Sequence, residues 1–423
     1  MKMHTEFFKF DSRIKEAADR ALKNCRQSFD RIEEVAEYNG QKVLAAFIRN
    51  GISEACLKGS TGYGYDDMGR EKLDRIFAEC FGAEDALVRH NFMSGTHTLV
   101  TALYGVLRPG DVMTCVTGTP YDTLQETLGI KGESCGNFLE YGIQYRQKEL
   151  LPDGTPDLEA VAEAAKESRM VYIQRSRGYS LRPSLTIEQI EKIIKAAKTA
   201  NPDVVVMVDN CYGEFVEKLE PCDVGADLMA GSLIKNPGGG IALTGGYIAG
   251  RHDLVEACAF RLSCPGVGRE IGCTHDQLRP MYQGIFYAPT VVEAAVKTAV
   301  FAASLFGGLG FGVTPEADEY RTDIIQAVKL ENAQRLCAFC KGIQKGSPVD
   351  SFVTPEPWAM PGYDSQVIMA AGAFTLGASI ELSADAPLRE PFAVWMQGGL
   401  TWPSGKTGVM LAAQSMLEEG LIQ

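Results

Sequence analysis

The chain has 423 residues, of which 45% are hydrophobic and 22% are charged, and its 41 basic and 54 acidic residues leave a formal charge of −13. A chain of this length exceeds one compact core of ordinary size, so two domains are expected. The negative charge argues against a general nucleic-acid binder and against a protein held on an anionic membrane.

The N-terminal residues, MKMHTEFFKFDSR, contain no apolar segment of the kind that a signal peptide needs, and the most hydrophobic stretch, 291–311, carries Glu293 and Lys297. No membrane span is therefore predicted. Twelve scattered cysteines indicate reduced thiols and a cytoplasmic location. Cys337 and Cys340 form a C-x-x-C without a second pair, and the five histidines show no metal spacing, so no metal site is expected.

Residues 1–50 are predicted to form a helical arm, because apolar positions recur at helical spacing up to Asn50 and Gly51 closes the run. A larger domain over 51–290 follows, in which short apolar or β-branched runs alternate with helical stretches. Its strands are expected at 86–90, 112–117, 170–174, 204–209, 228–232 and 246–249. This alternation favours the α/β class with a mostly parallel sheet.

Residues 291–423 are predicted to form a linking helix and a small α+β domain. Helices are expected at 289–309, 322–345 and 406–419, and strands near Phe352, at 365–371 and at 375–382.

Two neighbouring runs carry the strongest chemical signal, VVVMVDN at 204–210 and AGSLIKNPGGG at 230–240. Asp209 ends one apolar run, and Lys235 follows the next, which places both at the edge where α/β sheets bind ligands. A pyridoxal 5′-phosphate site needs an anion to keep the pyridine nitrogen protonated and an amine to form a Schiff base. We predict that Lys235 is this amine, with its pKa lowered by its surroundings, and that Asp209 is this anion. Taken singly, each residue could instead be a surface lysine in a glycine-rich turn or a helix-capping aspartate.

A candidate phosphate turn lies in FMSGTHTL, where Ser94, Gly95 and Thr96 stand between a strand and a helix. Backbone N–H groups at a helix N-terminus suit a phosphate, and Ser232 could add a hydroxyl. The alternative is a simple helix cap by Ser94 or Thr96. Tyr121, in GTPYDTL after the next strand, could stack on the pyridine ring, although an isolated tyrosine there could also serve loop packing.

In this order the motifs resemble those of the fold-type I pyridoxal phosphate enzymes, most of all the cystathionine β-lyase and methionine γ-lyase group. The phrases STGYGYDDMGRE, NFMSGTHT, GTPYDTLQE, VDNCYGEF, SLIKNPGGGIA and FAVWMQGGLTWPSGK look like the branch described as aluminium-resistance or methionine-γ-lyase-like proteins. The resemblance extends from about Ser28 to the C-terminus. It implies a PLP-dependent transferase-like fold of type I, with a seven-stranded sheet in the large domain and a small C-terminal α+β domain.

The resemblance also implies that Lys235, Asp209 and Tyr121 are catalytic, and that Gly95, Thr96 and Ser232 hold the phosphate. It implies a homo-oligomer, a dimer of dimers with active sites shared between subunits. The residues that would reach a neighbour's phosphate are Tyr63 or Tyr65 and Arg70, although their spacing departs from the usual Y-x-R of the group.

Three arginines are candidates for anion binding. Arg389, in APLREPF, is expected to bind the substrate carboxylate, because arginine can clasp a carboxylate with two parallel hydrogen bonds; a surface arginine is the alternative. After the strand at 170–174, RSRGYS replaces the family's usual acidic, proline-rich turn. Arg175 and Arg177 could compensate by meeting the cofactor's phenolate oxygen or a substrate anion.

The resemblance favours β- or γ-elimination on a sulfur-containing amino acid, with Lys235 removing the Cα proton and Tyr121 assisting as acid or base. The same apparatus serves aldolases, desulfurases and aminotransferases, which stay as alternatives. A non-catalytic stress-response protein that retains the fold is a further alternative. A nicotinamide enzyme is not favoured, because no G-x-G-x-x-G follows an early strand.

Overall fold

A computed structural model describes residues 6–133, 135–360 and 365–422 of the chain. The chain divides into two compact units. The large unit comprises Asn39–Tyr287, and the small unit comprises the residues up to Tyr38 together with Ala288–Gln423.

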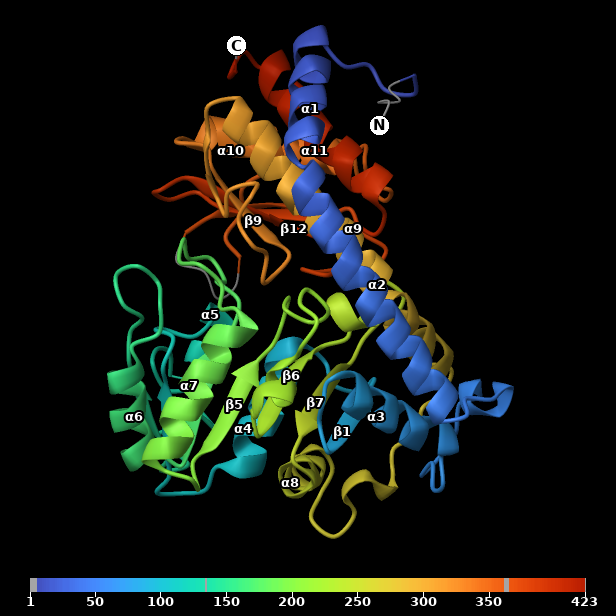
Figure 1. The fold of residues 1–423 in the computed structure, drawn as a ribbon, viewed down its shortest axis with the longest axis vertical. Helices are drawn as coiled ribbons and strands as arrows, with labels where there is room; N and C mark the ends of the chain where they lie inside the picture. The colour runs from blue at the N-terminus through green and yellow to red at the C-terminus, as the bar shows by residue number, and fades with distance from the viewer. Residues whose placement is uncertain (1–5, 134, 361–364, 423) are drawn as a thin grey trace. The chain divides into compact units, whose positions relative to one another are not determined.

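A seven-stranded sheet forms the centre of the large unit, in the order β1-β7-β6-β5-β4-β2-β3. Only β7 runs antiparallel to its neighbours among these strands, which confirms the predicted mostly parallel sheet. Figure 1 shows β5, β6 and β7 side by side, with α7 and α4 beside them. The strands are β1 (Asp85–Arg89), β2 (Val112–Cys115), β3 (Gln144–Gln147), β4 (Met170–Gln174), β5 (Val205–Asp209), β6 (Leu228–Ser232) and β7 (Gly246–Gly250).

The interior strands match the apolar runs of the sequence because every residue of β4, β5, β6 and β7 is buried. Strands covered on both faces are expected to be apolar throughout. The edge strand β3 was not predicted, since its sequence QYRQ is polar and only half-buried. The helices of this unit are α3 (Met68–Cys80), α4 (Gly95–Val106), α5 (Asp122–Gln125), α6 (Leu158–Glu167), α7 (Ile187–Ala200) and α8 (His252–Leu262).

The small unit contains a five-stranded antiparallel sheet in the order β10-β11-β12-β9-β8. Its strands are β8 (Gly312–Thr314), β9 (Ile325–Lys329), β10 (Val367–Ala370), β11 (Ser383–Pro387) and β12 (Ala393–Gln397), and its helices include α10 (Ala333–Lys345) and α11 (Trp402–Glu418). The predicted helix at 322–345 is wrong in its first half, which forms β9. No strand forms near Phe352, and the run at 375–382 lies outside regular structure, before β11.

The predicted N-terminal arm is helical, as α1 (Ser12–Asn24) and α2 (Arg26–Arg49). It does not stand apart, because Phe10, Ile14 and Phe29 share one buried cluster with residues of α10 and α11. This shared cluster is the reason that the residues up to Tyr38 belong to the small unit. The second division, at Ala288, lies close to the predicted 290.

One helix in the described part of the chain, α9 (Leu278–Gly308), is long and apolar enough to cross a membrane, and 78% of its most apolar window is buried. Such burial fits a core helix. Helix α9 begins well before the predicted Pro289, because Pro280, Gly284 and Pro289 are residues that usually interrupt a helix.

Candidate active site

Lys235 and Asp209 lie at the carboxyl ends of two neighbouring parallel strands. Asp209 is the last residue of β5, and its partner across the ladder is Ala230 of β6. Lys235 follows the end of β6 and caps a short 3₁₀ turn, 236–238. The sheet topology thus brings together the two residues that the sequence singles out, at the edge where open α/β sheets bind their ligands.

The Asp209 carboxylate is 7% exposed, and its hydrogen-bond donors are neutral. The Cys211 N–H donates to Oδ1 at 3.1 Å, and the Tyr172 hydroxyl donates to Oδ2 at 3.4 Å. Burial raises the pKa of Asp209, although the two Cys211 hydrogen bonds and the charge of Lys235 oppose the rise. A buried carboxylate held by neutral donors favours a cationic partner, such as a protonated pyridine nitrogen.

The Lys235 ammonium donates to the Tyr212 hydroxyl, and Nζ lies 3.8 Å from the centroid of the Tyr212 ring. Burial by itself lowers the pKa of Lys235, but Tyr212, Cys211 and Glu214 outweigh burial, and the net pKa is raised. The expectation of a lowered pKa is therefore wrong for the chain without its cofactor. Aromatic and acidic neighbours stabilise the ammonium form.

The predicted phosphate turn is the N-terminus of α4. Ser94 caps this helix, as its Oγ accepts from the His97 N–H at 3.1 Å. The first intrahelical bond runs from the Thr98 N–H to the Ser94 carbonyl, so the N–H groups of Gly95 and Thr96 precede the helical ladder. These two groups suit a phosphate, while the Ser94 side chain serves as the cap.

Ser232 lies against this turn. A Cβ built on Gly95 would come within 3.4 Å of the Ser232 Cβ and 3.7 Å of the Cys211 Sγ. The Ser232 hydroxyl is buried, and it has no hydrogen-bond partner within the described chain. A buried hydroxyl without a partner is costly and requires a reason. A phosphate oxygen would satisfy it, so these residues fit the phosphate of pyridoxal phosphate.

Tyr121 immediately precedes the short helix α5, and its N–H donates to the Gln174 side chain at 2.7 Å. Thr123, two residues later, shares a 2.6 Å hydrogen bond with Thr96 of the phosphate turn. The structure thus brings the Tyr121 loop to the N-terminus of α4. The Tyr121 ring lies 5.8 Å from the Tyr179 ring, and its stacking on a cofactor stays a prediction.

Arg175 has a different role from the one predicted. Its side chain is fully buried, where Nη1 donates to Asn210 Oδ1 at 2.8 Å and Nη2 donates to Glu217 Oε2 at 2.7 Å. The Glu220 carboxylate lies 3.7 Å from Nη1. These partners commit the guanidinium to the fold of the loop after β5, so Arg175 does not serve an external anion.

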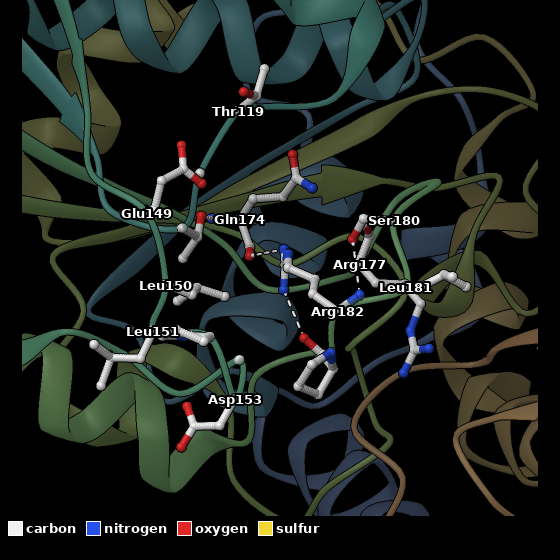
Figure 2. A pocket seen from close by; sticks show the side chains of 15 residues that line it. Thr119, Glu149, Leu150, Leu151, Asp153, Gln174, Arg177, Ser180, Leu181 and Arg182 are labelled. Carbon is white, nitrogen blue, oxygen red and sulfur yellow. Dashed lines mark hydrogen bonds between the residues drawn. The ribbon is translucent and has the colours of Figure 1, made fainter. Parts of the chain in front are cut away.

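Arg177 is also buried, at the wall of a pocket of about 690 Å³ beside the ends of β2 and β4. Figure 2 shows the side chains around this pocket, including Gln174, Arg177 and Arg182. The Arg182 guanidinium donates to the carbonyls of Gln174, Ser176 and Pro183. The pocket adjoins the Tyr121 loop through Gln174, and an anion-binding role of Arg177 stays a prediction.

Tyr63 and Tyr65 are exposed, by 71% and 63%, and their rings lie 5.6 Å apart. Arg70 is only 2% exposed, and its Nη1 donates to the carbonyls of Gly64 and Gly272, at 2.9 and 2.8 Å. The expectation that Arg70 reaches a neighbouring subunit is therefore not met here. The guanidinium instead fastens the loop that presents the two tyrosines.

Arg389 lies in the exposed turn between β11 and β12 of the small unit. Its carbonyl accepts from the Phe392 N–H at 2.8 Å, which closes the turn. Its assignment to a substrate carboxylate stays a prediction.

Three residues of the site were missed, namely Cys211, Tyr212 and Glu214. All three lie within five residues after Asp209 in VDNCYGEF, and the cluster of polar and aromatic residues after a buried strand was an available signal. The Glu214 carboxyl is buried, where Oε1 accepts from the Tyr247 hydroxyl at 2.8 Å, and burial raises its pKa to about 8. No metal-binding cluster occurs among residues 6–133, 135–360 and 365–422.

Comparisons with known proteins agree with this geometry. The family model described as methionine gamma-lyase matches residues 14–417. The uncharacterized protein YnbB of Bacillus subtilis is 49% identical over 92% of this chain and 93% of its own length. The crystal structure of a carbon-sulfur lyase involved in aluminium resistance, from Clostridium novyi, is 48% identical, covers 96% of both chains and has a TM-score of 0.92.

A more distant structure, CalE6, a methionine gamma lyase from Micromonospora echinospora, shares the fold at 19% identity, with a TM-score of 0.54 over 82% of this chain and 87% of its own. The predicted type I fold and the predicted cofactor, pyridoxal phosphate, are confirmed by these relationships. The chain belongs to the methionine γ-lyase family of pyridoxal phosphate-dependent enzymes, in the branch associated with aluminium resistance.

Proposed function

We propose that this chain is a carbon-sulfur lyase that carries out β- or γ-elimination on a sulfur-containing amino acid. The observation that carries the proposal is the buried Asp209 at the end of β5 and the half-buried Lys235 just after the neighbouring strand β6, beside the unsatisfied hydroxyl of Ser232. A buried acid, a half-buried amine and a phosphate cradle at one sheet edge support cofactor chemistry rather than a retained but inactive fold.

The chain's own residues would hold the cofactor by its two ends. The N–H groups of Gly95 and Thr96 and the Ser232 hydroxyl would bind the phosphate, and the Asp209 carboxylate would keep the pyridine nitrogen protonated. Pyridoxal phosphate, when bound, supplies an aldehyde that Lys235 can hold covalently and a ring that withdraws electrons from the substrate Cα.

Lys235 would also move the proton on which elimination depends. Its Nζ would take the proton from the substrate Cα, and departure of the sulfur from Cγ would also require a second proton to be removed from Cβ. Tyr121, on the loop that Gln174 and Thr96 hold near the turn, would donate to the departing sulfur. The Arg177 side of the adjoining pocket would receive a substrate anion.

The first experiment is the visible absorption spectrum of the purified protein before and after borohydride reduction, with peptide mass mapping. The expected result is a yellow protein that loses its colour on reduction and carries a pyridoxyl group on Lys235. A colourless protein that stays unmodified after added pyridoxal phosphate would refute the proposed chemistry and favour a non-catalytic protein.

The reaction itself requires a substrate screen. Cysteine, cystathionine, homocysteine and methionine should be tested for keto acid together with thiol release, and Lys235→Ala should abolish both products. Transfer of the amino group to an added keto acid, without thiol release, would instead identify an aminotransferase.

We further propose that the enzyme acts as a homo-oligomer with shared active sites, and in the cytoplasm. The exposed pair Tyr63 and Tyr65 supports the first part, because large aromatic side chains held on a fastened loop suit contact with a second copy. The described cysteines are all free thiols, which is compatible with a reducing compartment.

A further inference from the structure

Tyr212 has an unusual backbone conformation for a residue with a side chain. Its φ is +72°, in the left-handed region that non-glycine residues seldom adopt. The conformation is held by a tight turn, in which the Gly213 N–H donates to the Asn210 carbonyl at 2.9 Å. A non-glycine residue kept in this region is a reason to look for a function of its side chain.

The side chain of Tyr212 contacts Lys235 in two ways. Its hydroxyl accepts a hydrogen bond from Nζ, and its ring centroid lies 3.8 Å from the same nitrogen. A phenol oxygen and a π face both favour an ammonium ion over a neutral amine. Tyr212 therefore stabilises the protonated form of Lys235 when the amine is free.

Other titratable groups also face Lys235. Cys211 and Glu214 lie in the loop after β5, and Asp209 ends that strand. Burial raises the pKa of the Cys211 thiol far above its ordinary value and that of Glu214 to about 8, so both are mainly uncharged at neutral pH, and Glu214 adds a negative charge beside Lys235 only above that pH. Tyr212 is the neighbour that combines an electrostatic effect with direct contact at Nζ.

We propose that Tyr212 is a positioning residue that holds the free ε-amino group of Lys235 as an ammonium ion and thereby sets the pH above which Lys235 captures pyridoxal phosphate. The inference rests on Lys235 being the cofactor lysine. Capture joins the amine nitrogen to the aldehyde carbon, and the aldehyde oxygen leaves as water with two protons. An ammonium ion must first release its third proton to solvent, so its stabilisation opposes capture at low pH.

The test measures Lys235 in the apoprotein, so that it is independent of turnover. The protein is labelled with a trace of acetic anhydride over a series of pH values, and acetylation of the Lys235 peptide is quantified by mass spectrometry. In Tyr212→Phe the midpoint of labelling should fall by roughly one pH unit, because a hydrogen bond to a charged group is lost. In Tyr212→Leu it should fall further, because the ring contact is lost as well.

The pH dependence of pyridoxal phosphate capture, measured by absorbance, should shift together with the labelling midpoint. The rate at a pH below the wild-type midpoint should rise up to roughly tenfold in Tyr212→Phe. Tyr104→Phe is the matched control, since it also removes a phenol hydroxyl, one that donates to the Gly136 carbonyl at 2.7 Å and does not contact Lys235. Its midpoint should equal that of the wild type.

An unchanged or raised midpoint in Tyr212→Phe would overturn the inference, and this single variant keeps the test valid if Tyr212→Leu does not fold. If the labelling midpoint of Lys235 fell as far in Glu214→Gln as in Tyr212→Phe, the inference would also be overturned, because the buried carboxyl would then account for the stabilised ammonium ion. Failure of the proposed function is recognised separately, because Lys235 would then carry no pyridoxyl group after reduction, whatever its labelling midpoint.

Discussion

Arg175 binds Asn210, the residue that directly follows Asp209, through a 2.8 Å hydrogen bond from Nη1 to Oδ1. The two residues lie just beyond the ends of β4 and β5. Arg175 also packs so closely under Gly213 that a Cβ there would come within 2.5 Å of Nη1. One buried guanidinium thus braces the turn that carries both Asp209 and Tyr212.

Replacement of Arg175 by alanine should strongly destabilise the protein. The change would leave the carboxylates of Glu217 and Glu220 without their buried cation, and breaking such a pair costs about 3–5 kcal/mol. Urea denaturation of the apoprotein checks this. Arg146→Ala, which removes an exposed ion pair with Glu167, is the control and should change the unfolding free energy little. Equal effects of the two substitutions would contradict the assigned role.

The Ser232 hydroxyl should matter for the cofactor and not for the fold. Because it is buried without a partner in the described chain, Ser232→Ala should leave the melting temperature of the apoprotein unchanged or slightly raised. The same change should raise the dissociation constant of pyridoxal phosphate about tenfold, through loss of one hydrogen bond to a charged group. Differential scanning fluorimetry and an absorbance titration measure the two effects.

Ser168→Ala provides the opposite pattern for comparison. Its hydroxyl is buried but shares a 2.7 Å hydrogen bond with Thr114, so its loss should lower the apoprotein melting temperature and leave cofactor affinity unchanged. If Ser232→Ala instead destabilised the apoprotein without weakening cofactor binding, Ser232 would not be a phosphate ligand.

Glu214 should make the apoprotein less stable as the pH rises. Burial raises the pKa of this carboxyl from 4.5 to about 8, so the folded state binds the proton more tightly than the unfolded state. The protonated carboxyl therefore stabilises the folded state fully at low pH. This stabilisation is lost as the pH rises from 4.5 to about 8, because only the folded state holds the proton in that range. Glu214→Gln keeps an acceptor for the Tyr247 hydroxyl and removes the titration.

The unfolding free energy of wild type and Glu214→Gln should therefore be similar near pH 4.5, and the variant should become the more stable protein as the pH approaches 8. Denaturation at a series of pH values measures this difference. Glu167→Gln, which changes an exposed carboxyl paired with Arg146, is the control. A difference that did not grow with pH in Glu214→Gln would show that the carboxyl is ionised throughout.

The centre of the site could be predicted from the sequence because it depends on topology. Buried parallel strands are continuous apolar runs, and their carboxyl ends meet at one edge, which brings Asp209 and Lys235 together. The polar edge strand β3 carries no such signal. The helix expected at 322–345 was wrong in its first half because IIQAVKL satisfies both a helical and a buried-strand pattern.

The roles of individual arginines could not be predicted, because a charged residue has the same signature whether it faces a ligand or an internal carbonyl. Arg70 and Arg175 are both buried and bonded within their own chain. The position of Tyr212 was equally inaccessible, since its positive φ depends on the turn that Arg175 braces rather than on a glycine.

The shared active site predicts complementation between two inactive variants. Lys235→Ala lacks the cofactor lysine, and a double variant, Tyr63→Ala with Tyr65→Ala, lacks the exposed aromatic pair. If the tyrosines complete a neighbour's site, each mixed dimer regains one intact site, because one subunit supplies the lysine and the other supplies the tyrosines. Random reassociation should then restore about a quarter of the wild-type sites.

Arg70 is unsuitable for this test, because its guanidinium holds the loop of its own chain and its loss would disturb both tyrosines. The two variants should be unfolded together and refolded, and mixed oligomers should be verified by native mass spectrometry before thiol release is measured. If each subunit used its own tyrosines, every mixed dimer would contain two defective sites. Verified mixed oligomers without recovered activity would therefore refute the shared site, whereas recovery near a quarter would place Tyr63 or Tyr65 of one subunit at the active site of its partner.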